Sequence, residues 1–168
     1  MMNIFGEIEF KPLVRFGKTI AGYYVAKDGS GILGKKGKYL SVWNDTKGYP
    51  TSSVTIPSDF FPDYRYKTKE NGKNISLKIN LHRAVMETWN PIDSNPPESL
   101  MEEWNQVITS EMVGQPRIPE NYKKWVEDTA FVDHVDRDIT NNSMDNLRWV
   151  IPKDNESNRK QFKLNEPL

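Results

Sequence analysis

The first half of the chain alternates short apolar segments with glycine-rich breaks. Apolar residues gather at 13–16 and 20–25, and breaks follow them at Gly17-Lys18, 27–31 and 34–38. Breaks at this short spacing are typical of β-hairpins and argue against long helices. We therefore predict a small β-rich region here.

Aromatic residues are interleaved with lysines in this region. They are Tyr23, Tyr24, Tyr39, Trp43 and Tyr49. We predict that they pack a small sheet, with residues 39–43 as a further strand, because large rings usually contribute buried area. The break at 34–38 is a cationic turn suited to contacting phosphates, and a plain solvated turn is the alternative.

A half-buried strand is predicted at 75–79, where Ile75, Leu77 and Ile79 alternate with polar residues. Residues 44–74 are rich in turn formers, so we predict a loop there with one hairpin. In that hairpin residues 64–66 would pair with 75–79 through a turn at Asn71-Gly72-Lys73.

A helix is predicted from Asn80 onwards, because Asn is a favoured N-cap and the following apolar residues recur at helical spacing. Those residues are Leu81, Ala84, Val85, Thr88 and Trp89. His82 lies in the first turn, and we interpret it as a packed, hydrogen-bonded residue. Support of a functional site is the alternative.

Residues 90–130 combine a proline-rich loop with helical spacing at 100–108 and again at 119–128. We predict an added helical layer over the core, with a dimer interface or partner-docking surface as the alternative.

The segment 131–152 indicates strand, loop, strand and helix. Phe131-Val132 begins a short strand that carries Asp133 and His134, and a polar run then forces a loop. Residues 147–150 fit the second strand, and Pro152 suits the first turn of a helix.

This segment brings together residues suited to phosphodiester hydrolysis. A histidine side chain has an intrinsic pKa of about 6.5, so His134 could accept a proton from water near neutral pH. Asp133 offers a carboxylate and Asn155 an amide carbonyl, which are the hard oxygen ligands that Mg²⁺ prefers. We interpret Asn141, Asn142 and Asp145 as loop-forming residues only.

The spacing of these residues resembles the HNH endonucleases, most closely the phage homing type with a ββα-metal (His-Me finger) core. Asn146 lies twelve positions after His134, and Asn155 lies nine positions further on. The resemblance covers residues 131–162 and extends weakly to 77–89. The chain departs from the phage homing pattern in two ways. Some forty residues separate the predicted helix from Asp133, where that pattern has a short connection, and the chain ends soon after the motif.

The resemblance implies a role for each motif residue. His134 would be the general base, and Asn146 would hold the loop that orients it, so both are predicted catalytic residues. Asp133 and Asn155 would bind one Mg²⁺ or Mn²⁺ ion. Asn158 and Arg159 are possible metal or phosphate contacts. The predicted DNA contacts are Lys35, Lys36, Lys38 and Arg148.

The charge distribution agrees with a DNA-binding face, although the net charge is zero. Residues 1–80 carry thirteen Lys or Arg and seven Asp or Glu, whereas residues 81–130 carry four and nine. A basic region beside an acidic one is expected if one face meets phosphates, and an ordinary dipolar surface is the alternative. The chain has no Cys, which excludes disulfides and cysteine-ligated zinc.

We therefore predict an α+β protein with three parts: a β-rich basic DNA-contacting region (1–79), a helix with an acidic helical insert (80–130) and a C-terminal ββα-metal nuclease core (131–168). The predicted activity is metal-dependent cleavage of double-stranded DNA by a phage homing nicking endonuclease, acting as a monomer or homodimer. A less specific phage or bacterial HNH nuclease and a non-catalytic DNA-binding regulator are the alternatives. With no long apolar run and no leader, we expect a cytoplasmic protein, with a phage-infected bacterium as the host.

Overall fold

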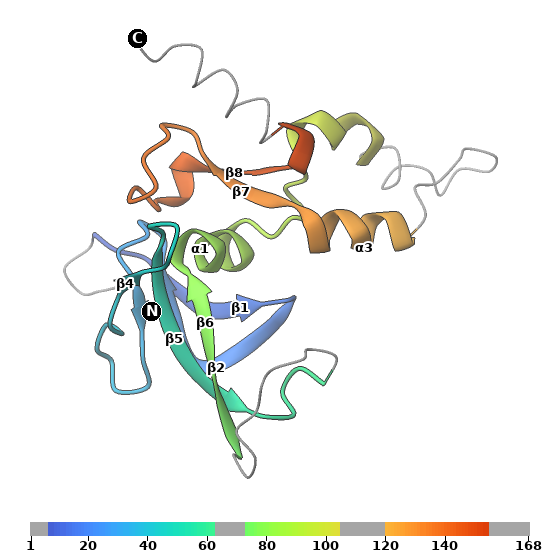
Figure 1. The fold of residues 1–168 in the computed structure, drawn as a ribbon. Helices are drawn as coiled ribbons and strands as arrows, with labels where there is room; N and C mark the ends of the chain where they lie inside the picture. The colour runs from blue at the N-terminus through green and yellow to red at the C-terminus, as the bar shows by residue number, and fades with distance from the viewer. Residues whose placement is uncertain (1–6, 63–72, 105–119, 155–168) are drawn as a thin grey trace.

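The computed structural model describes residues 7–62, 73–104 and 120–154 (Figure 1). These residues form small antiparallel sheets and a few helices, the mixed α and β composition predicted from the sequence. Helix α1 (Leu81–Trp89) lies between the N-terminal strands on one side and the β-hairpin of the C-terminal segment on the other (Figure 1).

The first sheet has the order β1-β2-β3 and comprises Phe10–Arg15, Lys18–Ala26 and Ile32–Leu33. The turn between β1 and β2 places Phe16 and Gly17 at φ angles of 51° and 72°, the left-handed conformation that two-residue hairpin turns need. The predicted cationic turn is present after β3, where the Gly34 N–H donates to the Lys38 carbonyl at 2.8 Å. Among the described residues, this part of the chain therefore begins with a small antiparallel sheet.

The second sheet has the order β4-β5-β6 and comprises Trp43–Asn44, Pro50–Pro57 and Asn74–Asn80. The predicted strand at 75–79 is confirmed, and its predicted pairing with residues 64–66 stays a prediction. Ile75 pairs with Ile56 of β5, whereas residues 64–66 lie outside the described residues. β5 alternates Val54 and Ile56 with Thr55, so burial of its apolar face outweighs the turn-forming prolines at its two ends.

The predicted strand at 39–43 is mostly wrong. Tyr39 forms a single bridge to Leu33, and only Trp43 belongs to a strand, the two-residue β4. Packing of the aromatic residues is likewise only partly confirmed. Tyr23 is buried, whereas Tyr24, Tyr39 and Trp43 are exposed.

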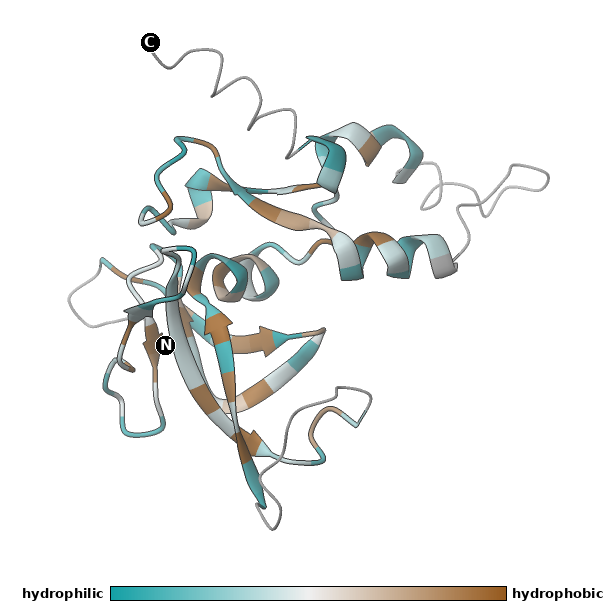
Figure 2. Cartoon of the chain, viewed as in Figure 1, coloured by the Kyte–Doolittle hydropathy of each residue, from teal (hydrophilic) through white to brown (hydrophobic). Residues whose placement is uncertain are grey.

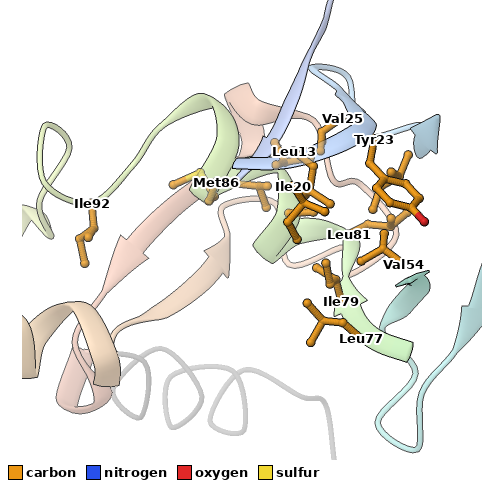
Figure 3. Packing of buried hydrophobic residues seen from close by; sticks show 14 of the residues in the cluster. Leu13, Ile20, Tyr23, Val25, Val54, Leu77, Ile79, Leu81, Met86 and Ile92 are labelled. Carbon is orange, nitrogen blue, oxygen red and sulfur yellow. The ribbon is translucent and has the colours of Figure 1, made fainter. Parts of the chain in front are cut away.

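Helix α1 supplies the centre of the core. Its buried residues are Leu81, Ala84, Val85, Met86 and Thr88. They meet the apolar sides of both sheets, including Leu13, Ile20 and Ile79 (Figure 3). Along β6 the buried apolar residues alternate with exposed polar ones, and the hydropathy colours of this strand in Figure 2 alternate in the same way. Asn80 takes the predicted N-cap position, but its side chain donates to Asp45 Oδ2 at 2.9 Å and makes no cap hydrogen bond.

The acidic segment adds a short 3-10 turn, η1 (Glu98–Leu100), a helical piece at 101–104 and helix α3 (Glu120–Thr129). Trp104 and Val126 are buried in the common core, and the Trp104 indole N–H donates to the Asp93 carbonyl at 3.0 Å. Lys123 of α3 forms an ion pair with Asp93. These contacts agree with an added helical layer packed over the core.

Among the described residues, no helix has the length and apolar character that crossing a membrane requires.

Two arginines converge on one carboxylate where α1 meets β1. The Arg15 guanidinium donates from Nη1 to Glu87 Oε2 at 2.6 Å, and Arg83 Nε lies 3.6 Å from Glu87 Oε1. All three side chains are largely buried. Burial lowers the pKa of Arg83, and the charge of Glu87 opposes that shift. Glu87 is therefore the anion that makes two buried cations tolerable.

We predict that Glu87→Ala lowers the free energy of unfolding by about 3 kcal/mol, because it leaves two buried guanidinium groups without their carboxylate. Urea unfolding with an unchanged m-value measures the loss. The matched control is Glu9→Ala, which removes an exposed ion pair with Lys27 at 3.5 Å and should cost less than about 1 kcal/mol. Equal losses in the two variants would contradict this account of Glu87.

Candidate active site

The site is built on a two-stranded antiparallel hairpin, β7 (Phe131–His134) and β8 (Leu147–Val150). Both strands agree with the predicted strand, loop and strand. The hairpin rests on α1 through Trp149, whose indole N–H donates to the Asn90 carbonyl at 2.7 Å. The Arg83 guanidinium lies over the ring of the same tryptophan, 5.0 Å from its centroid. Residues 152–154 are helical, so the predicted helix begins at Pro152.

The loop between the strands is closed by Asn146. Its Nδ2 donates to Asp136 Oδ1 at 2.8 Å and to the Asn141 carbonyl at 2.9 Å, and its Oδ1 accepts from the Asp136 N–H at 3.0 Å. Hydrogen bonds from the Asn141 side chain, the Asp138 N–H and Asn146 lower the pKa of Asp136. The geometry is that of a residue that holds a loop closed, which is the task that the resemblance implies for Asn146.

His134 ends β7 and is buried, with 6% of its surface exposed. Its Nε2 lies 2.8 Å from Oδ1 of Asn142, which is itself only 3% exposed. Sequence reasoning treated Asn142 as a loop residue, so its contact with His134 was missed. The sequence does not distinguish Asn142 from its neighbours, because the loop is a run of Asp, Thr, Asn and Ser without any periodic pattern.

Two aromatic rings from distant segments enclose His134. The ring centroid of His82 lies 5.2 Å away in an edge-on arrangement, and Tyr49 is stacked at 6.2 Å. The rings of Tyr49 and His82 are 5.0 Å apart. His82 is therefore packed, as predicted, but its buried Nδ1 has no hydrogen-bond partner among the described residues. Its place beside His134 favours the alternative that it supports the site.

The pKa of His82 is lowered from 6.5 to about 3. Burial is the largest cause, followed by repulsion from His134 and from Arg83. His82 is consequently neutral at physiological pH, and it adds an uncharged wall to the pocket around His134.

Asp133 faces Arg148 across the hairpin. Arg148 donates to Asp133 Oδ2 from Nε at 2.9 Å and from Nη2 at 2.8 Å. The Asp133 side chain is 16% exposed and that of Arg148 is 44% exposed. A carboxylate at a strand end suits Mg²⁺, which commonly takes one or two carboxylates and fills its other positions with water and substrate. The described residues contain no group of three or more His, Cys, Asp or Glu that could hold a metal on their own.

Residues 107–157 match the family model described as HNH endonuclease. This segment therefore resembles the HNH endonucleases. The resemblance predicted from the Asp133, His134 and Asn146 spacing is thereby confirmed.

No curated protein matches the sequence. Among solved structures, the chain is similar to one described as "DNA binding and cleavage by the HNH homing endonuclease I-HmuI". The two chains share 20% sequence identity, and the TM-score is 0.49. The match covers 95% of this chain and 62% of the other chain, so this chain spans less than two thirds of that protein.

The described part of the HNH segment holds Asp133, His134, Asn146 and Arg148 on one hairpin and its loop. The other predicted DNA contacts, Lys35, Lys36 and Lys38, are exposed on the turn after β3. Asn155, Asn158 and Arg159 lie outside the described residues, so their metal and phosphate contacts stay predictions.

We predict that His82→Phe flattens the pH dependence of stability. The folded-state pKa of His82 lies below its unfolded value of 6.5, so the unfolded chain binds the proton first and stability falls as the pH drops below about 6.5. Between pH 7 and pH 5 the wild type should lose roughly 2 kcal/mol through this residue, and the variant should not. Urea unfolding at both pH values measures the difference, and an equal loss in both proteins would exclude His82 as its source.

Proposed function

We propose that this protein is a divalent-metal-dependent endonuclease that hydrolyses phosphodiester bonds in double-stranded DNA. The observation that carries the proposal is that Asp133 and His134 are consecutive residues at the end of β7 within the HNH segment, where the histidine is buried and hydrogen-bonded. A general base and a hard metal ligand are what such a hydrolysis requires.

His134 acts as the general base. Its ring accepts a proton from the attacking water while the bond between phosphorus and the 3′-oxygen breaks, and the departing oxygen takes up a proton from solvent. The walls formed by Tyr49 and His82 limit rotation of the ring. Because His82 stays neutral, it places no positive charge beside His134.

Asp133, together with Asn155, would hold the metal ion. A bound Mg²⁺ or Mn²⁺ would supply positive charge where negative charge grows on the phosphate. Arg148 neutralises Asp133 in the hairpin, and its exposed guanidinium is also suited to a DNA phosphate. Asn146 keeps the loop closed, so that the end of β7 stays in one conformation.

DNA is held by the basic N-terminal sheet. Lys35, Lys36 and Lys38 project from an exposed turn, and the exposed rings of Tyr39 and Trp43 lie close to it in sequence. Cations on a hairpin tip contact the phosphate backbone without reading sequence. A phage homing endonuclease that nicks one strand is the form of this activity we favour, because the motif spacing resembles that group most closely.

We predict that wild-type protein nicks supercoiled plasmid in Mg²⁺ but not in EDTA. His134→Ala should lower the rate by about 10²-fold to 10⁴-fold, which is the usual contribution of a general base. The matched control is Asp145→Asn, an exposed change in the same loop, which should cut like the wild type. Gel analysis of open-circular and linear products measures the activity. Tight DNA binding without cutting in any divalent metal would reject the nuclease and favour a regulator.

We predict that replacing Lys35, Lys36 and Lys38 by Ala weakens binding to all DNA sequences alike. The slope of log K against log salt should fall by about 0.9 for each phosphate that the variant no longer neutralises. Fluorescence anisotropy across a salt series measures both the affinity and the slope. The control is Lys73→Ala, an exposed lysine beside the start of β6, and a slope unchanged in the triple variant would remove this turn from the interface.

A further inference from the structure

Asn142 is wedged between His134 and the turn that joins β2 to β3. Gly29 of that turn has a φ of +74°, and a Cβ placed on it would overlap both the carbonyl carbon and the carbonyl oxygen of Asn142. Backbone atoms of the nuclease loop therefore fill the space that any other residue at position 29 would need. Glycine is therefore needed at position 29 for two reasons: the positive φ angle and the close approach of Asn142.

A second contact ties the same two segments together. The Met144 N–H donates to the Lys27 carbonyl at 3.0 Å. The turn itself is closed by hydrogen bonds from the Gly29 N–H to the Ala26 carbonyl at 3.1 Å and from the Ser30 N–H to Asp28 Oδ1 at 2.9 Å. The turn is thus a fixed support on which residues 142 and 144 rest.

The hydrogen bond between Asn142 and His134 has a direction. An amide oxygen can only accept, and a neutral imidazole carries one N–H. With Oδ1 of Asn142 at 2.8 Å, a neutral ring makes this hydrogen bond as the Nε2–H tautomer, which leaves the lone pair on Nδ1. A ring whose base nitrogen is chosen by its other hydrogen bond is a common way of preparing histidine for proton transfer.

We propose that Asn142 is a positioning residue that holds His134 in the Nε2–H tautomer, and that the turn containing Lys27 and Gly29 holds Asn142 in place. This inference rests on the proposed function, because the bare Nδ1 is then the atom that accepts the proton from water. The N-terminal sheet therefore helps to assemble the base, in addition to binding DNA.

The tautomer can be measured without substrate or metal. The chain has two histidines, so His82→Phe leaves only the signals of His134. Long-range ¹H–¹⁵N spectra of this variant, at a pH where the ring is neutral, should show Nε2 protonated and Nδ1 bare. A ring protonated on Nδ1 would overturn the proposal, since Asn142 would then have to present its NH₂ group to Nε2.

Substitutions at Asn142 separate positioning from simple stability. Asn142→Leu removes the acceptor and should mix the two tautomers, with kcat for plasmid nicking lowered by about 10-fold to 100-fold and KM unchanged. Asn142→Asp keeps an acceptor of the same shape and should restore the Nε2–H tautomer and most of kcat. An Asn142→Leu protein that is folded, with wild-type tautomer and kcat, would overturn the proposal.

The role of the turn has its own matched pair. Gly29→Ala and Gly17→Ala both place a side chain at a positive φ, but a Cβ at Gly17 meets nothing within 4 Å. Both should therefore lose stability through backbone strain, whereas only Gly29→Ala should disturb the His134 tautomer and lower kcat. Equal kcat and equal spectra in the two variants would overturn the part assigned to the turn.

Failure of the proposed function would look different. A wild-type protein that cuts no DNA but shows the Nε2–H tautomer would reject catalysis, and the catalytic meaning of Asn142 with it, while leaving its hold on the ring demonstrated. Cutting by a protein whose ring is protonated on Nδ1 would reject the positioning role alone.

Discussion

Burial of α1 is the constraint on which the remaining structure depends. Five of its nine residues are buried, so the helix needs apolar surface on more than one side. The two N-terminal sheets cover part of it, and the β7–β8 hairpin covers another part through Trp149 (Figure 1). The position of His134 relative to His82 follows from this arrangement, because His82 lies on α1 and His134 on the hairpin that packs against it.

Two uncharged rings, those of Tyr49 and His82, pack against His134. Tyr49 arrives from the turn before β5 and His82 from the first turn of α1. Burial keeps His82 uncharged, because an imidazolium there would be poorly solvated and close to His134 and Arg83. Charge in the site is instead concentrated on the outer edge of the hairpin, where Asp133 and Arg148 meet at the surface.

The nuclease loop depends on two kinds of support. Asn146 and Asp136 bind its ends from within, through hydrogen bonds that short polar side chains readily make to nearby backbone. Gly29 and Lys27 support it from outside, through close packing and a backbone hydrogen bond. The first support is local in sequence, whereas the second joins residues more than a hundred positions apart. The geometry around His134 is therefore inseparable from the N-terminal sheet.

Much of the local structure could be predicted from the sequence. Alternation placed β6, helical spacing placed α1 and α3, and the motif spacing placed Asp133, His134 and Asn146 on one strand and loop. These features depend on neighbours a few residues away, where propensity and side-chain periodicity act directly.

Only the tertiary structure decided the pairings between distant segments. β6 pairs with β5, a segment that the prolines at 50 and 57 made look like a loop, and Tyr39 and Trp43 are exposed although large rings are usually buried. The contacts of His134 with Asn142 and His82 were equally inaccessible, since nothing in a polar run distinguishes the one asparagine that becomes buried. Burial is a property of the assembled core: the sequence determined which residues could act, and packing determined which of them meet.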